Sequence, residues 1–137
     1  MSNYFDDCLY FRLNRILRRM TMLADSACAE YGFSSSYAYL LITININPCV
    51  GTVELADELN LSPSTITRLV DRLVRDGFVL RTKDGKRCET SCSAKGRELA
   101  EQMEITWRKF QLGMSERLGQ ELYVNLNHEL RKLDARI

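Results

Sequence analysis

The sequence predicts a mainly α-helical chain with one small β-hairpin, folded as a single domain over residues 1–137. Three observations support this fold class. Apolar residues recur at helical spacing over both ends of the chain. Two short helical segments meet at a tight turn near residue 61, and an Asp-Gly turn signal then separates two short runs that favour strands.

Long amphipathic helices are predicted at both ends of the chain. The first occupies residues 1–32 and ends at Gly32, and two more fill residues 94–137, with a break at Gly119. Their apolar stripes are Phe5, Leu9, Leu13, Ile16, Leu17, Met20, Leu23 and Ala27; Leu99, Met103, Trp107, Phe110, Met114 and Leu118; and Leu122, Leu126, Leu130, Leu133 and Ile137. The central module, residues 35–93, is too small to cover all three stripes. We therefore expect these helices to be the dimerisation helices of a homodimer.

The central module begins with two helices. A helix is predicted for residues 35–46, because apolar residues share one face and Pro48 and Gly51 then break the pattern. A short helix is predicted for residues 53–59, with Thr52 as its N-cap. Both predictions depend on the residues that begin or end a helix as much as on the spacing of apolar residues.

A third helix and a hairpin complete the module. Ser62 is placed to cap the helix, and Pro63 at its first position needs no backbone hydrogen bond. Two helices joined by a turn of three or four residues form the helix-turn-helix layout. After Gly77 the pattern changes to a hairpin around Asp84 and Gly85. The sequence thus predicts a winged helix-turn-helix with a two-stranded wing.

Basic charge is concentrated in this module. From Ser62 to Arg97 there are nine Lys and Arg against four acids, a net charge of +5, although the whole chain carries only +1. One face of the helix that follows Ser62 combines hydroxyls with arginines, whereas its other face is apolar. Such a segment on a near-neutral chain is typical of an element that meets a polyanion, and the alternative is a solvated face that happens to be basic.

Composition and motifs argue against several other classes. Hydrophobic residues make up 45% and charged residues 27%, which is typical of a globular rather than a disordered chain. The sequence has no run of about 18 apolar residues and no apolar stretch typical of a signal peptide, so we expect a cytoplasmic protein without membrane contact. No glycine-rich phosphate loop, nucleophile beside a histidine or metal triad is present, so neither an enzyme nor a cofactor is expected.

The cysteines are predicted to be free thiols. They stand at positions 8, 28, 49, 88 and 92, an odd number without the spacing of a disulfide framework. Cys88 and Cys92 resemble a metal-binding pair, but four residues along a strand separate them by roughly 13 Å. The single histidine, His128, lies far along the chain. A zinc site is therefore not expected.

The stretch "ELADELNLSPSTITRLVDRLVRDGFVLR", followed by "DGKRCETSCSAKG", resembles the MarR family of winged helix-turn-helix transcription regulators. In that family "TRLVDRL" lies in the recognition helix before a glycine, here Gly77. The wing carries an acid and a basic residue at its tip, here Asp84 and Lys86. The order of elements matches over nearly the whole chain. The resemblance implies a dimeric regulator that binds a near-palindromic operator in double-stranded DNA, most simply a repressor released by a small ligand.

A DNA-binding role assigns different contacts to different side chains. Hydroxyls and free N–H groups at the start of the recognition helix favour phosphate, and Arg68, one turn further on, suits a base edge. Wing residues would approach the backbone or minor groove at the flank of the site. The predicted DNA-binding residues are Ser62, Ser64, Thr65, Thr67, Arg68, Arg72, Lys86 and Arg87, with Thr67 and Arg72 at phosphates. Asp71 is expected to hold an arginine, with Arg75 at i+4 as the candidate.

Three possibilities beyond DNA binding remain open on sequence alone, and the first is an effector site. By resemblance, Tyr37 and Tyr39 line an effector crevice, although both also suit the core. A thiol-responsive regulator of the same fold is a second possibility. In the peroxide-sensing branch of the family a cysteine occupies the place of Tyr10, which leaves Cys8 two residues early and about 200° around the helix. A winged helix used only for protein contact is the third possibility, but the basic hairpin argues against it.

Overall fold

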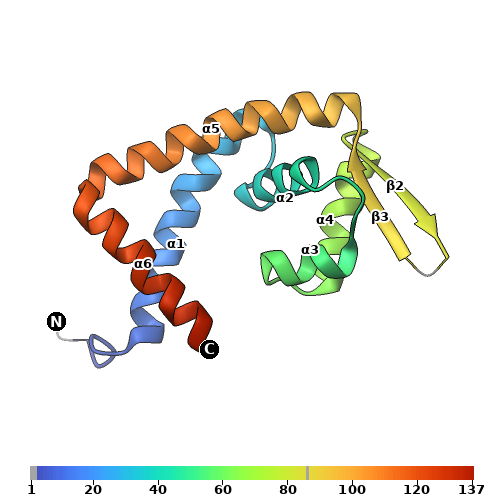
Figure 1. Cartoon of the computed structure of the whole chain (residues 1–137). Coiled ribbons are helices and arrows are strands. Elements are labelled where there is room, and N and C mark those ends of the chain that lie inside the picture. Colours follow the sequence, from blue (N-terminus) through green and yellow to red (C-terminus); the bar gives the residue numbers. More distant parts are fainter. Residues whose placement is uncertain (1–2, 86) are drawn as a thin grey trace.

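The computed structural model describes residues 3–85 and 87–137 and is mainly helical (Figure 1). Its elements are α1 (Leu9–Cys28), the 3-10 turn η1 (Ala29–Tyr31), α2 (Ser35–Ile46), β1 (Val50–Gly51), α3 (Thr52–Leu59), α4 (Pro63–Arg75), β2 (Val79–Asp84), β3 (Arg87–Cys92), α5 (Ala94–Leu118) and α6 (Gln120–Arg136). This order confirms the predicted helix-turn-helix, hairpin and long terminal helices. None of the helices in the described residues has the length and apolar character of a membrane span.

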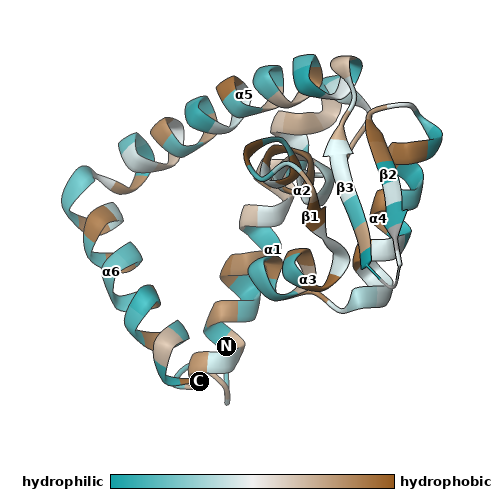
Figure 2. Cartoon of the chain, turned by 45° about the vertical axis from the view of Figure 1, so that its right-hand side comes forward, coloured by the Kyte–Doolittle hydropathy of each residue, from teal (hydrophilic) through white to brown (hydrophobic). Residues whose placement is uncertain are grey.

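Helix α2 forms the centre of the core. Leu40, Leu41 and Ile44 are completely buried, and Figure 2 shows α2 as a largely hydrophobic helix enclosed by its neighbours. A helix that is apolar on nearly all sides is stable only when other elements surround it. Here α1, α3, α5 and β3 pack around it. The recognition helix α4 adds Ile66, Leu69, Val70 and Leu73 to the same core.

The terminal helices extend beyond this core. Helix α5 runs from the wing side of the module to the far end of the molecule, where α6 turns back (Figure 1). No residue of α6 is buried, and α1 buries only Ala24 and Cys28. Large apolar side chains on these two helices are consequently exposed, among them Leu9, Ile16, Leu17, Met20, Leu23, Leu122, Leu126 and Leu130.

The predicted two-stranded hairpin is present as β2 and β3, and a third strand that the sequence did not predict, β1, joins its sheet. The strand order is β1-β3-β2 and all pairs are antiparallel, with Val79 opposite Cys92 and Val50 opposite Thr90. The added strand β1 lies in the stretch "NPCVGT", where the sequence predicted only a break. A two-residue strand is too short to produce an alternating pattern. The Thr90 side chain, itself completely buried, donates a hydrogen bond to the Val50 carbonyl at 3.0 Å and anchors β1.

Two predicted helix starts also change. The first helix begins at Leu9, and residues 29–31 form a 3-10 turn before Gly32, which adopts a positive φ of 71°. Helix α3 begins at Thr52, so Gly51 rather than Thr52 occupies the N-cap position. Apolar periodicity does not distinguish a helix from the turn that precedes or follows it, and the predicted boundaries shift for that reason.

Gly96 allows the start of α5 to approach the end of the helix-turn-helix closely. A Cβ atom at this position would lie 1.8 Å from the Phe78 carbonyl oxygen, which also accepts a hydrogen bond from the Ser93 N–H at 3.0 Å. Ser93 caps α5 through Gly96 N–H, and its hydroxyl donates to the Gly77 carbonyl at 2.6 Å. Lys95 and Gly96 therefore belong to the joint between the helix-turn-helix module and the long helix α5.

We expect Gly96→Ala to destabilise the protein by about 1–3 kcal/mol, because the added methyl group must displace backbone. Gly113→Ala is the matched control in the same helix, where an added Cβ meets no atom within 4 Å. The control should be neutral or slightly stabilising. Urea unfolding at one fixed protein concentration measures both variants. Equal stability of the two would contradict the close approach.

Candidate nucleic-acid interface

The recognition helix α4 begins at a well-formed cap, as the sequence predicted. The Ser62 hydroxyl accepts a hydrogen bond from the Thr65 N–H at 3.2 Å, and Pro63 occupies the first turn. The Ser62 hydroxyl also lies 2.8 Å from the Thr65 hydroxyl and 3.1 Å from that of Ser64. Three hydroxyls thus gather where N–H groups of the first turn point outward. This end of the helix suits an anion.

The two faces of α4 are separated as predicted. Ile66, Leu69, Val70 and Leu73 face the core, whereas Ser64, Thr67 and Arg68 are exposed. The Thr67 hydroxyl donates to the Pro63 carbonyl at 2.9 Å, which leaves its oxygen able to accept. Within the described residues Arg68 forms no hydrogen bond and no ion pair. Its guanidinium is therefore available to an external ligand.

Arg72 is engaged inside the molecule. Its Nη2 donates to the Gly32 carbonyl at 3.1 Å, and its Nε lies 3.7 Å from the Asp76 carboxylate. Its guanidinium carbon lies 4.5 Å from the ring centroid of Phe33 and 4.8 Å from that of Tyr37. The phosphate contact expected of Arg72 would have to compete with all of these partners.

Helix α4 is joined to the wing by an ion pair. The Asp71 carboxylate lies 2.6 Å from the Arg81 guanidinium of β2. The prediction that Asp71 pairs with Arg75 at i+4 is therefore wrong. The strand runs beside the helix, which brings Arg81 closer than a residue one helical turn away. Helical spacing alone gave no indication of this tertiary neighbour. The pair holds the wing against the recognition helix.

The wing is joined to α3 by a second cluster, close to the turn between β2 and β3. Arg87 lies 3.1 Å from Glu54 of α3 and 3.1 Å from Glu89 of its own strand. Sequence reasoning missed Glu54, since only the fold brings it beside a residue 33 positions away. Gly85 at the wing tip has a φ of 59°, and Lys83 is exposed. The predicted contact Lys86 lies outside the described residues.

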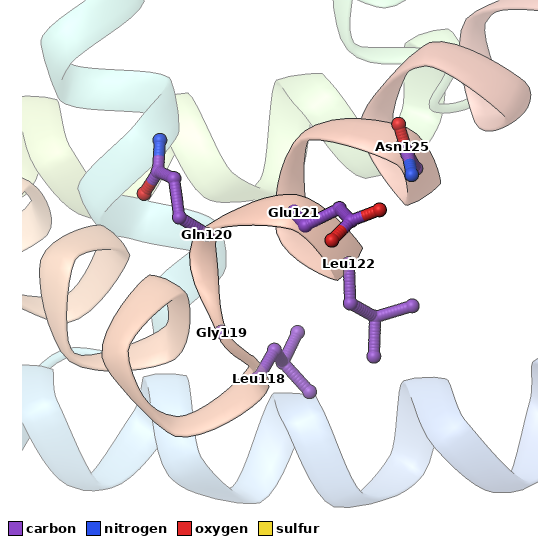
Figure 3. Close-up of a pocket in the computed structure, with 6 residues that line it drawn as sticks. All are labelled: Leu118, Gly119, Gln120, Glu121, Leu122 and Asn125. Carbon is purple, nitrogen blue, oxygen red and sulfur yellow. The ribbon is translucent and has the colours of Figure 1, made fainter.

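Neither Tyr37 nor Tyr39 lines either of two hollows found in the described part of the chain. Tyr37 is 8% exposed and packs on Phe33, and the Tyr39 hydroxyl donates to the Ser36 hydroxyl at 3.3 Å. One hollow lies at the bend between α5 and α6 and is lined by Leu118, Gly119, Gln120, Glu121, Leu122 and Asn125 (Figure 3). Another lies along α6 beside Tyr123 and His128. Tyr37 thus serves the core, and an effector role for both tyrosines stays a prediction.

The thiols are free and dispersed. Burial raises the pKa of Cys92 to about 11, against a smaller lowering by Arg97. Burial, with smaller contributions from Asp25 and Glu30, also raises the pKa of Cys28. Both thiols are therefore protonated near neutral pH and poorly nucleophilic. Among the described residues no group of three or more His, Cys, Asp or Glu side chains is placed to hold a metal ion.

Comparison with known proteins identifies similar chains. Residues 34–88 match the model of the MarR family, and no curated protein gives a significant sequence match. The fold is similar to that of E. coli MarR, solved as a cysteine-to-serine mutant with operator DNA, at a TM-score of 0.85 and 19% identity over 96% of this chain and 99% of that one. The fold is also similar to that of MepR in an S. aureus MepR–DNA complex, with a TM-score of 0.82 and 16% sequence identity over 99% of each chain. The transcriptional regulator SlyA has a TM-score of 0.82 and 16% sequence identity over 94% of this chain and 93% of that one.

Proposed function

Residues 34–88 match the MarR family within a MarR-like fold, and from this premise we propose that the protein is a dimeric, sequence-specific DNA-binding transcriptional regulator. One observation carries the proposal. The recognition helix buries one face and exposes on the other, beside a basic wing, hydroxyls and an arginine that suit DNA. Similar folds have been solved with DNA, which supports the same use here.

The proposed docking places the N-terminal end of α4 in the major groove. Ser62, Ser64 and Thr65 hold the phosphate side of the groove with hydroxyls and N–H groups, and Thr67 adds a further phosphate contact. Arg68 addresses a base edge, for which its forked guanidinium matches guanine. Because Arg68 has no described internal partner, this contact breaks no bond within the protein.

A homodimer is the proposed assembly. The exposed apolar stripes of α1 and α6 include Ile16 at 52% and Leu126 at 43% exposure, far from the buried state that such stripes favour. Figure 3 shows Leu118 and Leu122 on the same side of the α5–α6 bend, where they continue the apolar surface. A second copy would cover these faces symmetrically. Two recognition helices would then favour a near-palindromic operator with half-sites about 10 bp apart.

The alternatives are less well supported. A module used only for protein contact would not need exposed hydroxyls and an exposed Arg68 on the recognition helix. The MarR family consists of transcriptional regulators, and no enzymatic activity is proposed. Repression relieved by a small ligand is the regulatory mode we propose by family resemblance, with Tyr37 and Tyr39 as the residues to test. Its signature would be a compound that releases operator and no longer does so when Tyr39 is replaced.

The test of this function is selection of DNA by the purified protein. Fragments enriched from a random duplex library should share a near-palindrome whose half-site spacing fits two recognition helices. Binding to that fragment should exceed binding to a scrambled duplex at the same salt concentration by at least about 10³-fold. Enrichment of no common sequence would overturn the proposal, and binding without a repeated half-site would remove the symmetric dimer from it.

Arg87 provides a separate prediction for the wing. If it reaches a phosphate, Arg87→Ala should weaken operator and random DNA to similar extents and flatten the salt dependence by roughly one ion per subunit. Glu54→Gln is the control, since it removes one clamping carboxylate but leaves the guanidinium in place. Salt titrations compare the two variants with the wild type. A slope unchanged in Arg87→Ala, with equal losses in both variants, would make Arg87 a clamp of the wing and not a DNA contact.

A further inference from the structure

Three parts of the chain meet at Arg72. They are the end of the N-terminal arm at Gly32, the aromatic pair formed by Phe33 and Tyr37, and the recognition helix that carries Arg72 itself. In the described residues, the hydrogen bond to Gly32 is the one polar link between α4 and the arm. Arg72 therefore occupies the junction between a proposed dimerisation helix and the proposed reading element.

The partners of Arg72 are fixed parts of the fold. Gly32 ends the 3-10 turn in the left-handed region, with a φ of 71°, so its carbonyl points out of the helix that it terminates. Phe33 and Tyr37 are 7% and 8% exposed, and their rings lie 5.1 Å apart. Phe78 packs edge-on against Phe33 at 5.7 Å. The guanidinium thus closes over an aromatic cluster that is part of the core.

This geometry differs from that of an arginine held in readiness for DNA. A guanidinium that lies over two rings has its face covered, and one of its N–H groups is already donated to Gly32. Its side chain is 37% exposed, in contrast to the exposed Arg68 one turn earlier, which has no partner among the described residues. Cation–π contacts become stronger as they lose solvent, and here the rings are buried.

We propose that Arg72 is a positioning residue, which fixes the orientation of the recognition helix relative to the N-terminal arm and so sets the half-site spacing that the dimer accepts. The inference rests on the proposed function. In a dimer joined through its arms, the distance between the two recognition helices depends on the angle at this junction. A looser junction lets each helix tilt, and the dimer then accepts operators of other spacings.

The first experiment measures spacing preference. Wild type, Arg72→Gln and Arg72→Lys bind the selected operator and versions with one base pair added or removed between the half-sites. In Arg72→Gln the preference for the native spacing should fall about tenfold, because the cation–π contacts with both rings are lost. Arg72→Lys should recover part of it, because a cation still lies over the rings. The slope of affinity against salt should not change.

The matched control is Arg75→Gln, which replaces an exposed arginine of the same helix and should leave the spacing preference intact.

The second experiment needs no DNA. A nitroxide attached to a ketone-bearing side chain at position 64 reports the distance between the two recognition helices of the dimer, since the native cysteines preclude thiol labelling. The distance distribution should be narrow in the wild type and broader in Arg72→Gln, with Arg72→Lys between them. If the wild type selects no DNA, the function is wrong but this measurement still decides the junction. Unchanged distributions, or an intact spacing preference with a flattened salt slope, would overturn the inference and return Arg72 to phosphate contact.

Discussion

Leu126→Asp is expected to convert the protein into a monomer at micromolar concentration and to weaken operator binding at least about hundredfold. Leu126 lies in the apolar stripe of α6 with 43% of its surface exposed, so the substitution costs the isolated chain little. In a symmetric dimer the same change buries two unpaired carboxylates, at roughly 3–5 kcal/mol each. A separated subunit reads one half-site only, which accounts for the loss of affinity.

Analytical ultracentrifugation of wild type and variant measures this prediction. The matched control is Asn127→Asp, which adds the same charge one residue along α6 and outside the stripe. That control should remain a dimer with nearly unchanged operator affinity. A wild-type mass that stays monomeric at all micromolar concentrations would contradict the dimer. A dimeric Leu126→Asp would instead place the interface elsewhere.

The parts of the fold that the sequence predicted correctly are those with a local cause. Helix α2 has the predicted bounds, 35–46, because Gly32 and Pro48 enclose an apolar segment. The cap at Ser62 was predictable because the hydroxyl and the N–H that it satisfies lie three residues apart. The alternation of apolar and polar residues along α4 likewise separated its core face from its exposed face.

The errors have a tertiary cause. Strand β1 exists because β3 offers it a partner, and nothing in two residues signals that partner. Asp71 pairs with Arg81 and Arg72 reaches Gly32 through space, so helical spacing gave the wrong partner for the first and no indication of the second. The residue types that favour DNA were evident in the sequence. The packing determines which arginines are held by internal partners and which are available to contact DNA.

Arg68→Ala tests the reading of base edges directly. We expect it to weaken operator binding by about 1–3 kcal/mol and to relax the preference at one position in each half-site, with a smaller loss on scrambled DNA. The reason is that a bidentate contact to a base discriminates between sequences, whereas a phosphate contact is the same on every duplex. Stability should not change, since Arg68 is exposed and has no described internal partner.

The measurement compares Arg68→Ala with Arg75→Ala on operator and scrambled duplexes over a range of salt. Arg75 is an exposed arginine of the same helix, and its loss should affect both duplexes equally through charge alone. Both variants must remain folded dimers for the comparison to be valid. Because only the ratio of operator to scrambled affinity separates recognition of sequence from attraction to the backbone, a selective loss in Arg68→Ala assigns base readout to this residue. Equal losses on the two duplexes would remove Arg68 from that role and leave the hydroxyls of the first turn to carry the specificity.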